Sequence, residues 1–280
     1  MRVQVGDIRL FFDIEGAKLV PEGPVMRERP TVILLHGGPG LDHTEFWPFG
    51  STIADIAQVI YLDHRGNGRS DRSGPERWNL EVWADDLRAF CDALEIQRPV
   101  VLGSSFGGMV AQTYAAKYPE HPAKLILTNT MSRLRLDRMF PLFERLGGAR
   151  AAEVARRFFA DPMPNFLDYI QTCLPLYSQS PPVEGALDRV VINMEVGAYF
   201  VGGEMQTFDT KAALARVRCP TLVLSGGLDP VATTADVEEL AAALPASLVR
   251  AHHFPASGHA VLTDARDEAL AAVRAFLTTP

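Results

Sequence analysis

The sequence Val100-Val101-Leu102-Gly103-Ser104-Ser105-Phe106-Gly107-Gly108-Met109-Val110 places a glycine-flanked serine between an apolar run and a helical pattern. The apolar run predicts a buried strand, so the pattern Gly-x-Ser-x-Gly falls on a sharp turn from strand to helix. Gly103 and Gly107 must be small because such a turn brings the two backbones close together. The turn is expected to strain the backbone of Ser105 and to expose its hydroxyl, which makes Ser105 a candidate nucleophile.

Short apolar runs alternate with helical patterns on both sides of this turn, which is typical of a parallel α/β sheet. The predicted strands are Thr31–Leu35, Val59–Asp63, Pro99–Gly103, Leu125–Thr128, Thr221–Leu224 and Leu248–Phe254. The predicted helices are Glu45–Ala57, Leu80–Leu94, Phe106–Tyr118, Asp236–Leu244 and Asp264–Phe276. Residues 2–14 are expected to form a hairpin, and Lys18–Pro30 a loop rich in proline, glycine and charge.

The pattern changes between residues 131 and 214. This segment has helical stretches interrupted by prolines and shows no strand alternation. We therefore predict a core formed by residues 1–130 and 215–280, with a helical insertion over residues 131–214.

Composition and charge exclude several classes of partner. The chain has 280 residues, of which 47% are hydrophobic and 22% charged, and its net charge is −7. An acidic chain of this kind is a poor ligand for nucleic acid or anionic membranes. The first residues are too polar for a signal peptide, and no apolar run reaches membrane-spanning length. The three cysteines, Cys91, Cys173 and Cys219, show neither metal-ligand spacing nor a disulfide framework. We expect a cytoplasmic protein without a metal or cofactor.

A serine nucleophile needs a base within hydrogen-bond reach, and the base needs an acid that orients it. In sheets of this kind the partners follow in the order serine, acid, histidine, and ligands bind beyond the carboxyl ends of the strands. Asp229 directly follows the strand Thr221–Leu224, and His259 lies in the loop after Leu248–Phe254. We predict Ser105, Asp229 and His259 as a catalytic triad; His252 and His253 are poorer candidates because they fall inside the strand.

The negative oxygen that forms during attack on a carbonyl requires two hydrogen-bond donors. The backbone N–H of Phe106 is one candidate, since it directly follows the nucleophile. The loop His36-Gly37-Gly38-Pro39-Gly40 supplies the other, which we expect to be Gly38, while the glycines also let a substrate approach the backbone. The side chain of His36 is expected to hold this loop in place.

Five motifs together resemble the α/β-hydrolase fold and, within it, the proline iminopeptidase family. They are His36–Gly40, Asp63–Ser70, the turn at Ser105, Gly227-Leu228-Asp229 and Gly258-His259. The resemblance implies a mostly parallel sheet with a helical cap at residues 131–214. It also implies a serine hydrolase that cleaves a small amide or ester, or a short peptide, through an acyl-enzyme.

The resemblance also implies substrate contacts. Glu195, followed by the aromatic pair Tyr199 and Phe200, resembles the family's glutamate that recognises a substrate amine, and we expect Glu195, Tyr199 and Gly37 to contact substrate. Glu204 is expected to be a solvated helix residue. The chain departs from the family at Phe106, where tryptophan is usual, and at Pro230, where some relatives have an acidic residue.

Two other functions remain open. A carboxylesterase would need no free substrate amine, and a binding protein on the same fold would not need the triad for catalysis. Epoxide hydrolases and dehalogenases of this fold use an aspartate nucleophile, and Ser105 argues against both. Oligomeric state is not predicted from the sequence.

Overall fold

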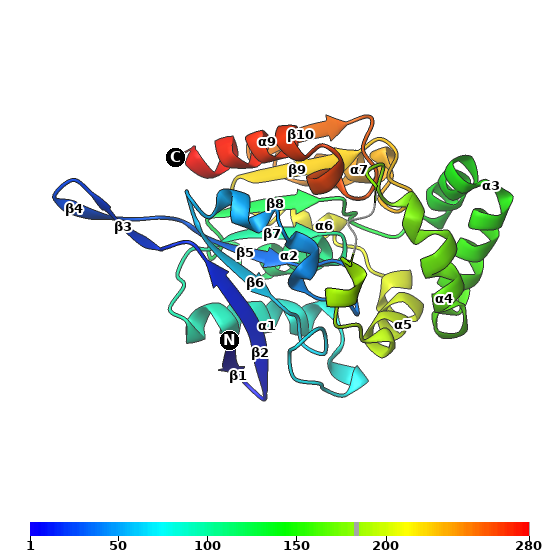
Figure 1. Ribbon diagram of the computed structural model, residues 1–280, viewed down its shortest axis with the longest axis horizontal. Helices are drawn as coiled ribbons and strands as arrows, with labels where there is room; N and C mark the ends of the chain where they lie inside the picture. The colour runs from blue at the N-terminus through cyan, green and yellow to red at the C-terminus, as the bar shows by residue number, and fades with distance from the viewer. Residues whose placement is uncertain (182–184, 280) are drawn as a thin grey trace.

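The computed structural model describes residues 1–181 and 185–279. Eight strands form a central sheet in the order β1-β2-β6-β5-β7-β8-β9-β10, in which β1 and β2 are antiparallel to their neighbours and the other strands run parallel (Figure 1). The strands of this sheet are β1 (Arg2–Val5), β2 (Ile8–Glu15), β5 (Thr31–Leu35), β6 (Gln58–Leu62), β7 (Val100–Ser104), β8 (Lys124–Thr128), β9 (Thr221–Gly226) and β10 (Val249–Phe254). The predicted fold is confirmed.

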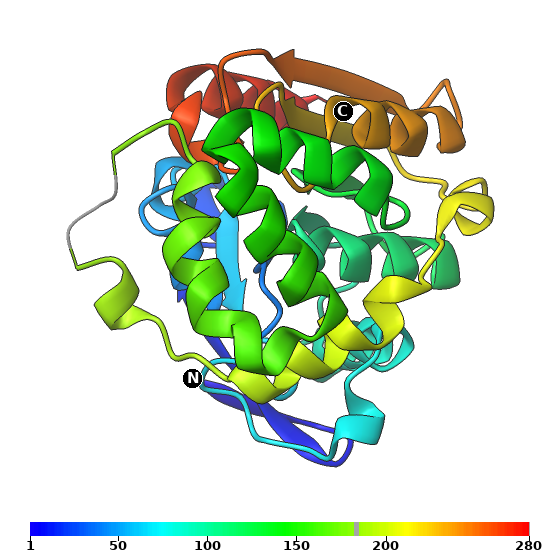
Figure 2. The ribbon, with the colours of Figure 1, turned by 90° about the vertical axis from the view of Figure 1, so that its right-hand side faces the viewer.

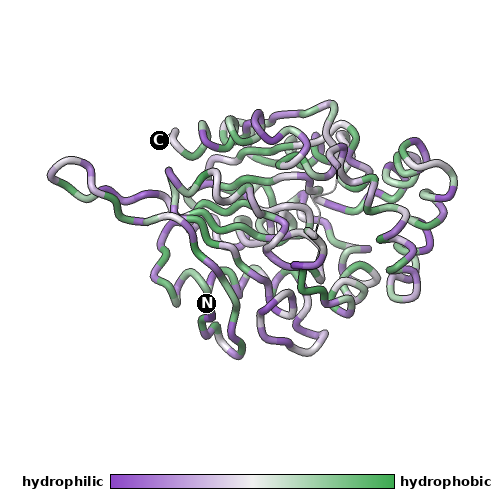
Figure 3. Tube along the Cα trace, in the orientation of Figure 1, coloured by the Kyte–Doolittle hydropathy of each residue, from purple (hydrophilic) through white to green (hydrophobic). Residues whose placement is uncertain are grey.

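Helices cover both faces of the sheet because the strands are apolar on both sides. On β5, Ile33 and Leu35 pack into one buried cluster with α1, α2 and α7, while Val32 and Leu34 pack into a second cluster with α9. These helices are α1 (Leu80–Ala93), α2 (Phe106–Lys117), α7 (Thr234–Ala243) and α9 (Arg266–Thr278), with the short α8 (Val261–Asp264) before α9. Hydrophobic residues concentrate along the strands in the interior (Figure 3). No described helix is both long and apolar enough to cross a membrane.

Four further helices lie between β8 and β9 in the chain, and the first three of them lie beyond the carboxyl ends of the parallel strands (Figures 1 and 2). They are α3 (Leu136–Ala160), α4 (Pro162–Thr172), α5 (Met194–Gly202) and α6 (Lys211–Leu214). The two predicted helices, Arg133–Leu146 and Ala151–Phe159, correspond to the two parts of α3, which a kink separates at Gly148, where φ is 75°. The first part begins at Leu136 instead of Arg133. Short 3-10 helices complete the chain: η1 (His43–Phe46), η2 (Gly50–Ile53), η3 (Pro75–Arg77), η4 (Leu174–Leu176), η5 (Leu187–Arg189) and η6 (Glu204–Gln206).

The chain leaves the sheet and returns to it through a narrow neck. Arg133 and Asp209 form an isolated antiparallel bridge, and the N–H of Thr210 donates to the carbonyl of Ser132 at 2.9 Å. Gln112 of α2 anchors both sides, because its Nε2 donates to the carbonyl of Met131 at 3.1 Å and its Oε1 accepts from Thr210 Oγ1 at 2.7 Å. The two ends of the helical segment are therefore held together at one point.

Two local predictions are wrong. The predicted loop Lys18–Pro30 contains a hairpin of β3 (Leu19–Glu22) and β4 (Val25–Glu28) that projects from the body of the protein (Figure 1). Gly23, with φ of 61°, supplies the turn that joins them. The predicted helix Glu45–Ala57 is instead split into η1 and η2 around Pro48, which lacks the N–H that a continuous helix requires.

A buried ion pair joins the loop after β6 to α1. Arg65 Nε and Nη2 donate to the two carboxylate oxygens of Asp86 at 2.7 Å each, and its Nη1 and Nη2 donate to Asp7 at 3.1 and 2.8 Å. The side chains of Arg65 and Asp86 are 1% and 9% exposed, whereas that of Asp7 is 59% exposed. Water can therefore replace Asp7 as a hydrogen-bond partner of Arg65, but it cannot replace the buried Asp86.

We predict that Asp86→Asn lowers the free energy of unfolding by about 3 kcal/mol, because it leaves the buried guanidinium without its buried counter-charge. Asp7→Asn is the matched control and should cost less than about 1 kcal/mol, since that carboxylate is exposed. Urea denaturation of the two variants measures both values. Equal losses would contradict the assignment of Asp86 as the principal partner.

Candidate active site

Ser105 lies at the turn between β7 and α2. Its φ is 51° and its ψ −115°, a backbone conformation that residues other than glycine rarely adopt. Its N–H donates to the carbonyl of Thr128 at 3.0 Å, and its own carbonyl accepts from Thr130 Oγ1 at 2.8 Å. Contacts with the end of β8 thus hold the strained turn in place.

The glycines on either side of Ser105 are required by close backbone contacts. A Cβ on Gly103 would lie 2.4 Å from the carbonyl oxygen of Gly107, and a Cβ on Gly107 only 2.0 Å from that of Leu35. The expectation that both residues must be small is therefore met. The second contact also brings the end of β5 against the start of α2.

The structure brings Ser105, His259 and Asp229 together in one chain of hydrogen bonds. Ser105 Oγ lies 2.9 Å from His259 Nε2, and His259 Nδ1 lies 2.8 Å from each carboxylate oxygen of Asp229. Asp229 is fully buried and accepts further bonds from the N–H groups of Val231 and Ala232 at 2.8 and 2.9 Å. A carboxylate at Nδ1 keeps a proton on that nitrogen, so Nε2 is free to accept the proton of the serine hydroxyl.

Asn129 is a residue of this site that the sequence analysis missed. Its Nδ2 donates to Asp229 Oδ2 at 3.1 Å and to the carbonyl of Gly258 at 3.0 Å, and its Oδ1 accepts from the N–H of Val261 at 3.3 Å. Asn129 therefore holds both the acid and the loop that carries the histidine. Its position directly after the predicted strand Leu125–Thr128 was the available signal, and its φ of 51° is one that asparagine tolerates.

Gly38 and Phe106 lie beside Ser105 on the wall of one cavity. Phe106 begins α2, so its N–H has no partner one turn earlier in the helix. Gly38 has a φ of 112°, which a residue with a side chain would rarely adopt. Their role as donors to the developing negative oxygen stays a prediction.

His36 lies behind the glycine loop. Its Nε2 accepts from the N–H of His64 at 3.3 Å, which leaves Nδ1 to donate to the carbonyl of Gly37 at 2.7 Å. Burial lowers the pKa of His36, which agrees with a neutral ring that donates from one nitrogen and accepts at the other. These contacts support the expected structural role.

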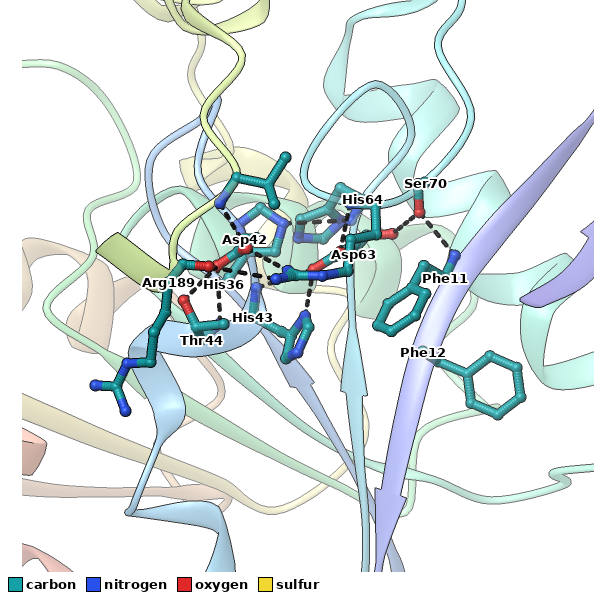
Figure 4. A network of polar contacts seen from close by, with 12 residues as sticks. Phe11, Phe12, His36, Asp42, His43, Thr44, Asp63, His64, Ser70 and Arg189 are labelled. Atoms are coloured by element: carbon teal, nitrogen blue, oxygen red, sulfur yellow. Dashed lines mark hydrogen bonds and ion pairs between the residues drawn. The ribbon is translucent and has the colours of Figure 1, made fainter. Parts of the chain in front are cut away.

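Two buried carboxylates fasten the neighbouring loops to one another (Figure 4). Asp63 accepts from the N–H and Nδ1 of His43 at 2.9 and 2.7 Å and from the N–H of Arg69 at 2.7 Å. Asp42 accepts from Arg69 Nη1 at 2.5 Å and from the N–H of Val191 at 2.9 Å. The glycine loop, the loop after β6 and the chain that enters α5 are thereby tied together.

The cavity at Ser105 has a volume of about 310 Å³ and is predominantly apolar. Helices α3, α4 and α5 supply much of its wall through Phe158, Phe159, Phe166, Tyr169, Phe200 and Val201. Tyr177 also lines it, with its ring centroid 4.8 Å from that of His259. Ser105 and His259 therefore lie on the wall of a space suited to an apolar group.

The structure does not bring Glu195 or Tyr199 to this cavity, although Gly37 does line it. Gly197, Phe200 and Val201 of α5 face the cavity, and the helical repeat places Glu195 and Tyr199 on another face, where both are exposed. Tyr199 instead packs against Trp78, with ring centroids 5.7 Å apart.

The expectation that Glu204 is a solvated helix residue also needs correction. Its Oε2 accepts from the N–H of Leu80 at 2.9 Å. Leu80 is the first residue of α1, and the first N–H groups of a helix have no partner within it. Glu204 thus satisfies a helix end instead of extending into water.

Comparison with known proteins agrees with this geometry. A family described as the alpha/beta hydrolase fold matches residues 30–265, and the chain belongs to that family. The proline iminopeptidase PfmaB of Pestalotiopsis fici is 31% identical over 233 residues, which cover 78% of this chain and 82% of that protein.

Two solved structures match nearly the whole chain. A proline iminopeptidase from Mycobacterium smegmatis has a TM-score of 0.79 at 25% identity and covers 99% of this chain and 97% of its own. A thermophilic esterase from Thermogutta terrifontis has a TM-score of 0.72 at 25% identity and covers 99% of this chain and 98% of its own. The chain is a serine hydrolase, as predicted.

We predict that Asn129→Gly lowers kcat by about 10- to 100-fold, because Asp229 and the loop of His259 lose a shared donor while glycine still permits the backbone conformation. Stopped-flow or plate-reader measurement of p-nitrophenolate release from a p-nitrophenyl ester gives kcat, and Ser105→Ala sets the background. An unchanged kcat in a variant that folds normally would remove Asn129 from the site.

Proposed function

We propose that the chain hydrolyses small amides and esters with an apolar group, using Ser105, His259 and Asp229 as its catalytic triad. The observation that carries this proposal is the hydrogen bond of 2.9 Å between Ser105 and His259 at the wall of an apolar cavity. Nucleophile, base and acid are assembled where a substrate can reach them.

In the proposed mechanism, the hydroxyl of Ser105 attacks the substrate carbonyl while His259 Nε2 takes its proton. Asp229 stabilises the imidazolium that forms, and the N–H groups of Gly38 and Phe106 bind the negative oxygen. His259 then gives the proton to the departing amine or alcohol, which leaves an ester on Ser105. Water attacks this ester by the same route, releases the acid and restores the serine.

We also propose that residues 131–214 act as the cap over a core of residues 1–130 and 215–280. Side chains from α3, α4 and α5 line the cavity, so this segment would select the substrate while the core performs the chemistry. Pro182, Val183 and Glu184, within the cap, lie outside the described residues.

Two substrate classes fit the site. The names of the relatives support an iminopeptidase that releases an apolar N-terminal residue such as proline. The position of Glu195 outside the cavity, together with the esterase neighbour, supports a carboxylesterase that needs no substrate amine at that residue.

We also propose a cytoplasmic location and a small substrate. The cysteines Cys91, Cys173 and Cys219 are buried free thiols, which supports a reducing cytoplasm. A net charge of −7 supports small-molecule or short-peptide substrates over nucleic acid.

A fluorophosphonate probe tests the catalytic proposal against the binding-protein alternative. We expect covalent labelling at Ser105, because His259 activates its hydroxyl, and no labelling in Ser105→Ala. Intact-protein and peptide mass spectrometry locates the adduct. A folded wild-type protein that forms no adduct would refute the proposed mechanism.

A substrate panel separates the two classes. We expect short-chain p-nitrophenyl esters to be cleaved, and cleavage of prolyl-p-nitroanilide would add the iminopeptidase activity. Because Glu195 lies outside the cavity, Glu195→Gln should leave kcat/KM for either substrate within about twofold. Selective loss of anilide cleavage in that variant would instead restore Glu195 as the residue that recognises the amine.

A further inference from the structure

Glu45 extends from η1 to the side of the nucleophile. Its Oε1 accepts from the N–H of Gly37 at 2.7 Å. A Cβ built on Gly37 would lie 3.1 Å from Glu45 Oε2 and 3.3 Å from Ser105 Cβ. The carboxylate and the serine therefore flank the same glycine of the loop expected to hold the negative oxygen.

Glu45 also differs chemically from the rest of the cavity wall. Among the described residues that line the cavity, Glu45 is the only acid, and His259 is the only basic residue. Most of the other lining side chains are aromatic or aliphatic. Glu45 is itself exposed, so its carboxylate can meet the charge of a bound molecule directly.

Desolvation and groups from four parts of the chain set the pKa of Glu45. Loss of hydration raises the pKa of Glu45 to about 7, while the N–H of Gly37, His259 from the loop after β10, and the Ser104 hydroxyl from β7 lower it. Asp42, in the loop that precedes Glu45, raises it. The carboxyl group therefore gains its negative charge as the pH rises through neutrality.

We propose that Glu45 is a specificity-determining residue that selects substrates by charge. Its carboxylate attracts a cationic or N–H-donating group of a substrate bound in the cavity and repels an anionic group there. This inference rests on the hydrolase function proposed above and names the substrate class that the same site favours.

Matched esters test the inference. One series varies the acyl group and uses p-nitrophenyl esters of hexanoic acid (neutral), 5-(trimethylammonio)pentanoic acid (cationic) and adipic acid (anionic). A second series varies the leaving group and uses acetates of phenol (neutral), 3-(trimethylammonio)phenol (cationic) and 3-hydroxybenzoate (anionic). A pH-stat follows all six substrates. At pH 8 we expect kcat/KM for the cation to exceed that for the anion, on the order of tenfold, in the series whose variable group reaches Glu45.

Glu45→Gln should bring that ratio close to one, because the glutamine carries no charge while its carbonyl can still accept from the N–H of Gly37. In the wild type the ratio should rise between pH 6 and pH 8 as Glu45 ionises, and it should stay flat in the glutamine variant. Glu144→Gln, which removes an exposed charge from α3 outside the cavity, is the control and should leave the ratio unchanged.

The outcomes distinguish the inference from the function on which it rests. Turnover of the neutral esters with equal cation-to-anion ratios in the wild type and Glu45→Gln would overturn the role of Glu45 and leave the hydrolase intact. If Glu45→Gln folds poorly, Glu45→Asp, which withdraws the charge from the cavity, should lower the ratio in the same direction. Absence of turnover on every ester, without labelling of Ser105, would overturn both proposals.

Discussion

The turn at Ser105 depends on backbone contacts that leave no room for side chains. Gly103 approaches Gly107 across the turn, and Gly107 approaches the last residue of β5. Because β5 ends in the glycine loop, the second contact places that loop beside Ser105. Parallel strands then deliver Asp229 and His259 to the same edge of the sheet. The geometry of the site thus follows from one close approach between a helix and a strand.

Much of this arrangement could be predicted from the sequence because its determinants are local. Apolar runs of strand length identified the parallel strands, and parallel strands collect the residues that follow them at one edge. Asp229 and His259 were predicted in this way, and the structure places His259 at hydrogen-bond distance from both Asp229 and Ser105. Asn129 occupies an equivalent place but was missed, because an asparagine after a strand is an ordinary turn residue. Asn129 reaches Asp229 because β8 lies between β7 and β9 in the sheet. No local sequence pattern predicts that strand order.

The substrate side of the site was less predictable. Glu195 and Tyr199 were inferred from a resemblance, but which face of α5 meets the cavity depends on how the helices pack together. Glu45 was hidden inside a predicted helix that Pro48 divides into two short turns. Only the resulting fold carries its side chain back to Gly37. Long-range packing, which periodicity does not encode, therefore decides which side chains meet a substrate.

The neck formed by Arg133 and Asp209 has a consequence for how this protein can diversify. Both ends of the helical segment are held together there, so a longer segment adds little to the entropic cost of closing the loop. That cost grows by about 0.6 kcal/mol for each doubling of loop length. Insertions, deletions and rearranged helices beyond the neck can accumulate without disturbing the pairing of β8 with β9. Natural variation can in this way reshape the cavity while Ser105, His259 and Asp229 keep their geometry.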